Sequence, residues 1–124
     1  MKEYTFTIPR ITPSLNKMLR THWAELRKLK HTWGGEVQAA TFDHDIPPAK
    51  TLEFRRMKIV SYRTSLLDPD NLYGGVKILV DRLVEQGFLY DDRQSCLDLE
   101  VSQVKVKKRS EQRTEITIVW REEC

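Results

Sequence analysis

Four aspartates stand at the two ends of one segment, residues 64–92, with the sequence TSLLDPDNLYGGVKILVDRLVEQGFLYDD. Asp68 and Asp70 are two positions apart near its start, and Asp91 and Asp92 are adjacent at its end. Carboxylate oxygens are preferred ligands of Mg²⁺, which usually takes one or two of them together with phosphate oxygens and water. The pattern therefore raises the hypothesis of a metal site. The alternative is that these residues are ordinary turn formers and helix caps.

The first acidic pair is expected to lie in an extended stretch, because Pro69 biases Asp68 toward extended geometry. Side chains alternate along an extended chain, so Asp68 and Asp70 would point to the same side, about 6–7 Å apart at Cα. Such a pair can share or flank a metal ion. Asn71 is expected to cap the following helix, to steady a carboxylate or to donate to a phosphate.

The second acidic pair must return to the first if the four residues form one site. A helix from just after Gly75 to near Gln86 would be about 16 Å long. Residues 87–91 span about 16 Å when extended. Closure within one chain is therefore possible, and closure across a dimer is the alternative.

A lysine lies near the start of this helix. The ammonium of Lys77 is suited to stabilising phosphate charge or orienting an attacking water. Asp81 follows one turn later on the same face and is expected to form a surface ion pair with Lys77.

Several spaced elements of the segment match together, and in this it resembles the RusA family of Holliday junction resolvases, which are magnesium-dependent endonucleases. The family pattern is D-x-D-N, a Lys four residues before an Asp, a Gly, and D-D followed closely by Gln. The matching residues are Asp68-Pro-Asp70-Asn71, Lys77 with Asp81, Gly87, and Asp91-Asp92 with Gln94. Pro13-Ser14-Leu15-Asn16 is similar to the Pro-Ser-x-Asn that follows the family's first strand. The stretch between Asn71 and Lys77 is longer than in the best-known members, so Lys77 is assigned by counting back from Asp81.

The resemblance implies a homodimer with an α/β fold that hydrolyses phosphodiesters of four-way DNA junctions with Mg²⁺ during recombination and repair. It implies catalytic roles for Asp68, Asp70, Asp92 and Lys77. The expected metal ligands are Asp68, Asp70 and Asp92, with Asp91 of the same pair as an alternate or supporting ligand and Asn71 in support. Two opposed strands must be cut, so one site per chain requires two chains about a two-fold axis.

Basic residues suited to gripping backbone phosphates occur near the first helix and near the last turn. The residues expected to contact DNA are Asn16, Arg20, Arg27, Lys105, Lys107, Lys108 and Arg109. The tryptophans Trp23, Trp33 and Trp120 stand at periodic positions and are expected in the core or an interface rather than stacked on bases.

The chain as a whole has the size and composition of one soluble domain, residues 1–124. Its net charge of +3 permits a nucleic-acid partner without demanding one. Cys96 and Cys124 belong to no CxxC pair and are expected to be reduced thiols without metal. No apolar run is long enough to span a membrane and the first residues alternate like a strand, so we expect a cytoplasmic protein.

Hydrophobic periodicity predicts an α+β (α/β) fold of order β-α-β-α-β-β, a mixed sheet with two helices packed on it. The predicted strands cover about residues 2–8, 52–62, 96–108 and 114–120. The predicted helices cover about residues 19–43, with a kink or split at Gly34-Gly35, and the acidic segment up to Gly87. A change of phase before Val104 suggests a bulge. The last two strands are expected to form a hairpin with the basic KVKKRS stretch at its tip, and Asp98 and Glu100 to lie on the solvated face.

Three other functions fit the same residues. The first is a nuclease for a different branched substrate. The second is a non-catalytic or differently targeted DNA-binding protein of the same fold. The third is a structural domain in which the aspartates only form turns and caps.

Overall fold

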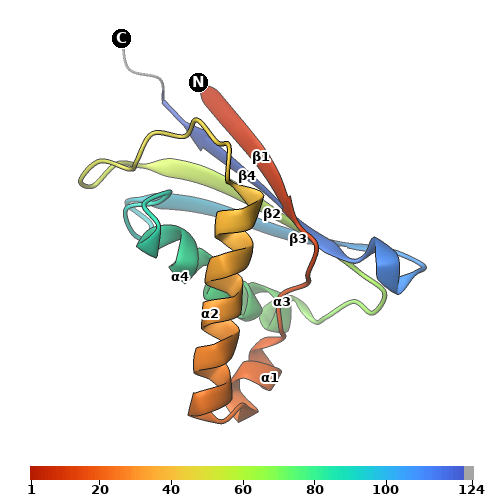
Figure 1. Cartoon of the computed structure of the whole chain (residues 1–124). Coiled ribbons are helices and arrows are strands. Elements are labelled where there is room, and N and C mark those ends of the chain that lie inside the picture. Colours follow the sequence, from red (N-terminus) through yellow and green to blue (C-terminus); the bar gives the residue numbers. More distant parts are fainter. Residues whose placement is uncertain (122–124) are drawn as a thin grey trace.

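The structure is a computed structural model that describes residues 1–121. Its elements are β1 (Lys2–Ile8), α1 (Leu15–Arg20), α2 (Trp23–Ala40), β2 (Arg55–Arg63), α3 (Pro69–Gly75), α4 (Lys77–Glu85), β3 (Leu97–Lys105), the 3₁₀ turn η1 (Arg109–Glu111) and β4 (Arg113–Trp120). Figure 1 shows the α-helices on one side of the sheet. The predicted α+β class and element order are confirmed, although each predicted helix is divided into two.

The four strands form one mixed sheet in the order β1-β4-β2-β3. β3 runs parallel to β2, and β4 runs antiparallel to both β1 and β2. The predicted hairpin of the last two strands is wrong, because β2 lies between them. The α3–α4 crossover returns the chain to the start of β2, so β3 runs parallel to that strand and pairs with the edge of β2 opposite to the one that pairs with β4. The basic stretch is therefore a crossover connection that contains η1.

The bulge predicted in β3 is also wrong. β3 pairs with β2 in unbroken register from Leu97 opposite Arg55 to Lys105 opposite Arg63. The alternation of apolar residues along β3 shifts before Val104 because a polar residue, Gln103, fills the inward position near the end of the strand. The amide of Gln103 donates to the carbonyl of Leu67 and accepts from its N–H, at 2.7 and 3.0 Å. The sheet there is covered by the 64–68 loop, and Val104 on the outer face is exposed.

The core lies between the sheet and the helices α2 and α4. Inward-facing strand residues alternate with outward-facing ones, which is the pattern of a sheet covered on one side. The central residues are Phe6, Ile8, Met57, Ile59, Ile116 and Ile118 from the strands and Trp33, Val37, Leu79 and Leu83 from the helices. Trp33 is fully buried, and truncating it to alanine is expected to cost about 3–5 kcal/mol.

The other face of the sheet is solvated, as predicted for Asp98 and Glu100. These carboxylates pair across the sheet with Arg56 at 3.7 Å and with Lys58 at 3.9 Å. Exposed ion pairs of this kind contribute little stability, about 1 kcal/mol or less. Asp98 and Glu100 are therefore outer-face residues of a half-covered sheet.

The first helical region breaks at Thr21-His22 and not at Gly34-Gly35. Thr21 is extended, with ψ 133°, and the His22 ring accepts from the N–H of Ala24 and caps α2. Both glycines lie inside α2, where burial of Trp33 and Val37 holds the helix despite their poor propensity.

Two further predictions concern the cysteines and the membrane. Cys96 is a buried free thiol, and Cys124 lies outside the described residues. Within residues 1–121, no helix has both the length and the apolar character needed to cross a bilayer.

Candidate functional site

The first acidic pair is placed by the start of α3. Asp68 is the N-cap residue, with extended backbone angles of −60° and 147°, and Pro69 takes the first helical position. Proline is favoured there because its fixed φ suits the helix and its missing N–H would have no partner. Asp70 is therefore helical, and the extended geometry predicted for this residue is wrong. Asp68 and Asp70 are both exposed, and within residues 1–121 neither carboxylate has a hydrogen bond or ion pair.

Asn71 joins the acidic segment to α1. Its Oδ1 accepts from the backbone N–H of Asn16 at 3.1 Å, so it is a tie between helices and not the predicted cap. Gly75 packs against the backbone of the same stretch. A Cβ added to Gly75 would lie 1.9 Å from the carbonyl oxygen of Pro13. The Pro13–Asn16 stretch and the acidic segment therefore pack directly on one another, and glycine is needed for the approach.

The second acidic pair returns to the start of α4 within one chain. Lys77 Nζ donates to Asp92 Oδ2 at 2.9 Å and to Asp81 Oδ1 at 3.2 Å. Hydrogen bonds from the ammonium to Asp92 and then to Asp81 raise the pKa of Lys77 above its ordinary value. The predicted pair of Lys77 with Asp81 is confirmed, and Asp92 joins it.

The return of the chain depends on the end of α4. Gly87 has a φ of +85°, and the N–H groups of Gly87 and Phe88 donate to the carbonyls of Val84 and Leu83. These bonds form a Schellman motif, in which glycine takes the left-handed position. The predicted helix stop at Gly87 is thus confirmed, and it turns the chain toward residues 91–92.

A buried arginine then holds this loop. Arg55 is 1% exposed and donates through Nη1 to the carbonyl of Phe88 at 2.8 Å. Its Nη2 donates to the carbonyl of Pro47 at 2.8 Å, and its Nε donates to Glu53 at 2.6 Å. Burial raises the pKa of Glu53, but the hydrogen bonds and charge of Arg55 and Lys50 outweigh it, and the net pKa is lowered. The start of the loop is therefore fixed by a hydrogen-bonded charge pair.

Asp91 and Asp92 have different surroundings although they are adjacent. Asp91 Oδ1 accepts from the N–H of Asp92, and its Oδ2 accepts from Arg93 Nε, both at 2.7 Å. The guanidinium of Arg93 lowers the pKa of the Asp91 carboxyl. The carboxylate of Asp91 therefore bonds to the two residues that follow it, whereas the carboxylate of Asp92 bonds to Lys77.

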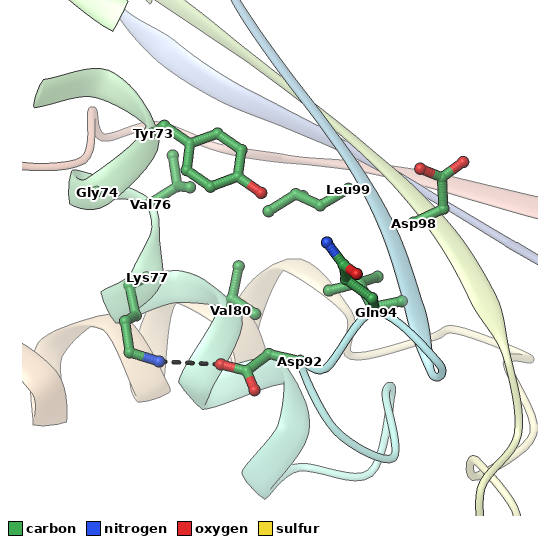
Figure 2. Close-up of a pocket in the computed structure, with 10 residues that line it drawn as sticks. Tyr73, Gly74, Val76, Lys77, Val80, Asp92, Gln94, Asp98 and Leu99 are labelled. Atoms are coloured by element: carbon green, nitrogen blue, oxygen red, sulfur yellow. Dashed lines mark hydrogen bonds and ion pairs between the residues drawn. The ribbon is translucent and has the colours of Figure 1, made fainter. Parts of the chain in front are cut away.

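A hollow of about 340 Å³ opens beside the Lys77–Asp92 pair. We call it the Lys77 hollow. Figure 2 shows that Tyr73 on α3 and Leu99 on β3 lie on one side of it and that Lys77 and Asp92 lie on another. The lining residues are Tyr73, Gly74, Val76, Lys77, Val80, Asp92, Gln94, Leu97, Asp98 and Leu99.

Asp70 lines a second hollow, with Tyr73 and residues 101–103 of β3. We call it the Asp70 hollow. Tyr73 lines both hollows, and our sequence reasoning gave this residue no role. The signal was its position three residues after Asp70, which places these two side chains on one face of α3, while Lys77 follows four positions later at the start of α4. Asp68 lines neither hollow.

The residues proposed as metal ligands do not form a closed cage. Among residues 1–121, no group of three or more histidine, cysteine, aspartate or glutamate side chains is arranged to hold a metal ion. The carboxylates of Asp81 and Asp92 converge, but the ammonium of Lys77 occupies the space between them. Asp70 and Asp92 line adjoining hollows, and this fits Mg²⁺ only where phosphate oxygens and water complete its ligands.

The residues expected to contact DNA are exposed and fall into two groups. Asn16 and Arg20 lie on α1, and Arg27 lies on α2 with its guanidinium 4.9 Å from the centre of the Trp23 ring. Lys105 ends β3, and Lys107, Lys108 and Arg109 follow it at the η1 end of the sheet (Figure 1). Both groups adjoin the segment around Asp68. Asn16 bonds to Asn71, and the N–H of Val106 donates to the carbonyl of Arg63.

The tryptophans differ from one another. Trp33 and Trp120 are 0% and 6% exposed, so the predicted core position is confirmed for both. Trp23 is 63% exposed, so it is not a core residue. Its place at the first position of α2, before the first buried turn, explains the difference.

Comparison with known proteins gives no family. No protein-family model matches the chain, and no curated protein matches it significantly.

Proposed function

We propose that the chain is a Mg²⁺-dependent, structure-selective endodeoxyribonuclease that resolves four-way DNA junctions as a homodimer. The observation that carries the proposal is the return of Asp92 to Lys77 beside a hollow that shares Tyr73 with the hollow of Asp70. A carboxylate without a partner, a lysine and a second carboxylate are thereby presented along one side of the α3–α4 region. The resemblance of the segment to junction resolvases supplies the substrate class.

The chemistry follows from the charges. Asp70 and Asp92, with Asp68 at the start of α3, would hold Mg²⁺ together with a phosphate of the substrate. The bound metal would supply an activated water and stabilise the leaving oxygen. The ammonium of Lys77 would exchange a carboxylate partner for a phosphate oxygen as negative charge develops there. Asp91 would support the site through the N–H of Asp92.

The proposed substrate also explains the distribution of basic residues. The groups on α1–α2 and at η1 would bind backbone phosphates on either side of the acidic segment, giving an affinity that falls steeply with salt. Two chains related by a two-fold axis would place two sites on opposed strands. The proposed place of action is the cytoplasm, where the free thiol of Cys96 would stay reduced.

The proposal is tested by cleavage of a labelled four-way junction and of a linear duplex of the same arm sequence, with and without Mg²⁺. We expect paired symmetric nicks in the junction that need metal and that fall by at least about 100-fold in Asp70→Asn. Asp43→Asn is the matched control, because it removes the same charge at an exposed position that lines neither hollow. Cleavage that is unchanged in Asp70→Asn would place the chemistry elsewhere.

The second candidate is a non-catalytic DNA-binding protein of the same fold. It is favoured by the ion pairs of Lys77, which neutralise the site without metal. This function predicts junction binding that is equal with and without Mg²⁺ and no nicks under either condition.

A further inference from the structure

The turn between α1 and α2 exposes two large apolar side chains. Trp23 is 63% exposed and Leu19 is 74% exposed, although the other two tryptophans of the chain are buried. An exposed indole offers a large flat surface that gains free energy when it is covered. Leu19 is the next-to-last residue of α1, and Trp23 is the first residue of α2. The turn therefore presents an apolar tip away from the core.

The indole contacts two neighbouring side chains, those of His22 and Arg27. His22 caps α2 through Ala24, and its ring centre lies 5.5 Å from that of Trp23. The guanidinium of Arg27 lies 4.9 Å from the indole centre, within range of a cation–π contact. An aromatic surface beside a cation is the arrangement that stacks nucleobases in proteins that bind single-stranded nucleic acid.

Charge indicates which partner would cover this surface. Residues 15–31 carry five basic side chains against one acidic side chain, Glu25, which pairs with Lys28 at 3.7 Å. The basic residues are Lys17, Arg20, Arg27, Lys28 and Lys30. A second copy of the chain seated here would bring like charges together, which opposes association. Phosphates on both sides of a base would instead be attracted.

The turn is also fixed relative to the acidic segment. The N–H of Asn16 donates to Asn71, and Gly75 packs on the carbonyl of Pro13. α1 therefore holds a constant position on α3, whose first turn carries Asp70. A base bound at the turn would position the backbone that follows it relative to the acidic site.

We propose that the α1–α2 turn is a nucleobase-stacking site in which Trp23 covers an unpaired base at a DNA branch point. Leu19 would extend the apolar surface, and Arg20 and Arg27 would bind the neighbouring phosphates. The proposal rests on the proposed function for the choice of DNA, and it adds the structural feature that the protein recognises. It predicts a preference for open junctions and single strands over blunt duplex.

Tryptophan fluorescence gives a direct test, because Trp23 is the exposed member of the three tryptophans. The protein is titrated in EDTA, which prevents cleavage, with a four-way junction, a single-stranded oligonucleotide and a blunt duplex. We expect emission to be quenched by the first two and little changed by the duplex. In Trp23→Phe the quenching should vanish while most of the affinity remains.

Affinity for the junction, measured by anisotropy of a labelled arm, separates stacking from simple charge attraction. Trp23→Ala should bind about tenfold more weakly, the effect of losing one base–aromatic stack. Phe42→Ala is the matched control, since Phe42 is 91% exposed in the loop after α2, and it should bind like the native protein. Urea unfolding of each variant shows that the fold is retained.

Three outcomes would overturn the inference. They are equal binding by Trp23→Ala, equal quenching by blunt duplex, and a change of Trp23→Ala from dimer to monomer in sedimentation, which would assign this face to a second copy. Cleavage that depends on Asp70 but not on Trp23 would leave the proposed function standing and this inference refuted. Quenching and binding that depend on Trp23, without any cleavage, would support this inference and refute the proposed function.

Discussion

The ammonium of Lys77 lies 2.9 Å from Oδ2 of Asp92, although the two residues are fifteen positions apart in the chain. This contact closes the acidic segment. It brings the loop after α4 back to the first residue of that helix, and Asp81, one turn further along α4, supplies a second carboxylate at 3.2 Å. The contact also sets which substitutions should affect cleavage and which should affect only stability.

Lys77→Met should lower junction cleavage by about 100-fold, as expected for the loss of a group that stabilises developing charge. Binding should be nearly unchanged, so the effect should appear in the single-turnover rate. Asp81→Asn is the control, because it removes the other partner of the same ammonium while leaving Asp92 in place. Equal losses in the two variants would mean that the ion-pair network matters as a whole and that Lys77 has no separate role.

The raised pKa of Lys77 has a consequence at alkaline pH. A cation whose folded-state pKa lies above its unfolded value stabilises the protein fully below the unfolded value and loses this effect as pH rises through the folded one. The ordinary value is 10.5 and the folded value is higher, so the pair should persist at pH 9. Lys77 is 61% exposed, so its contribution is expected to be below about 1 kcal/mol. Urea unfolding of native protein and Lys77→Met at pH 9 and pH 11.5 should show a small difference that shrinks at the higher pH.

Substitutions of Asp91 distinguish a role as a metal ligand from a role in shaping the turn. Asp91→Asn keeps an oxygen that can accept from the N–H of Asp92, but it loses the negative charge that binds Arg93. If Asp91 acts by shaping the turn, cleavage by Asp91→Asn should stay within about fivefold of native and Asp91→Ala should be worse. Single-turnover rates across Mg²⁺ concentrations make the comparison. A large rise in the Mg²⁺ requirement of Asp91→Asn would instead make Asp91 a metal ligand.

Gly75→Ala should destabilise the protein strongly. The added Cβ would lie 1.9 Å from a backbone oxygen of Pro13, which cannot move without shifting the loop before α1. Overpacking of this kind costs about 1–3 kcal/mol and occasionally more. Gly35→Ala is the matched control, since it meets nothing within 4 Å inside α2 and should stabilise by about 0.5–1 kcal/mol. Urea midpoints measure both, and similar shifts in the two variants would contradict the packing of α1 on α3.

Glu53 should contribute to stability at neutral pH and lose this contribution in acid. Its lowered pKa means that its effect is present above the ordinary value of 4.5 and disappears as pH falls through the folded-state value. Glu53→Gln should therefore be less stable by about 1–3 kcal/mol at pH 7, and the difference should shrink below pH 4. Glu100→Gln, which removes an exposed charge on the outer face, should show little difference at either pH. A constant deficit for Glu53→Gln would mean that packing and not charge is lost.

The elements that the sequence predicted well are those with strong periodicity. The first and last strands were recovered because Tyr4, Phe6 and Ile8 and the TEITIVW run alternate along an inward face. The stop at Gly87 was recovered because a left-handed residue is required there. The contact of Lys77 with Asp81 followed from helix spacing.

The errors concern features that depend on the neighbours of each segment. Nothing within residues 96–120 records that β2 separates β3 from β4, so the predicted hairpin was wrong. Val104 resembled an inward residue after a bulge, but Gln103 fills the inward position with bonds to Leu67. Asp70 was predicted to be extended, but it is helical. Pro69 restricts the backbone of the residue before it, Asp68, and not that of the residues after it. The loop that returns Asp92 to Lys77 is bonded at Phe88 by Arg55, which lies in a different part of the chain.

The position of β4 has a consequence for how the domain assembles. β4 follows every other strand in the sequence, yet it lies inside the sheet between β1 and β2, with Lys2 opposite Trp120. Within residues 1–121, β4 is the only strand that pairs with β1, so the backbone of β1 has no strand partner until residues 113–120 have been synthesised. Pairings this distant in sequence close large loops and slow folding. The emerging chain would therefore carry two unprotected strand edges on the ribosome, and insertion of β4 would complete the sheet and the core in one late step.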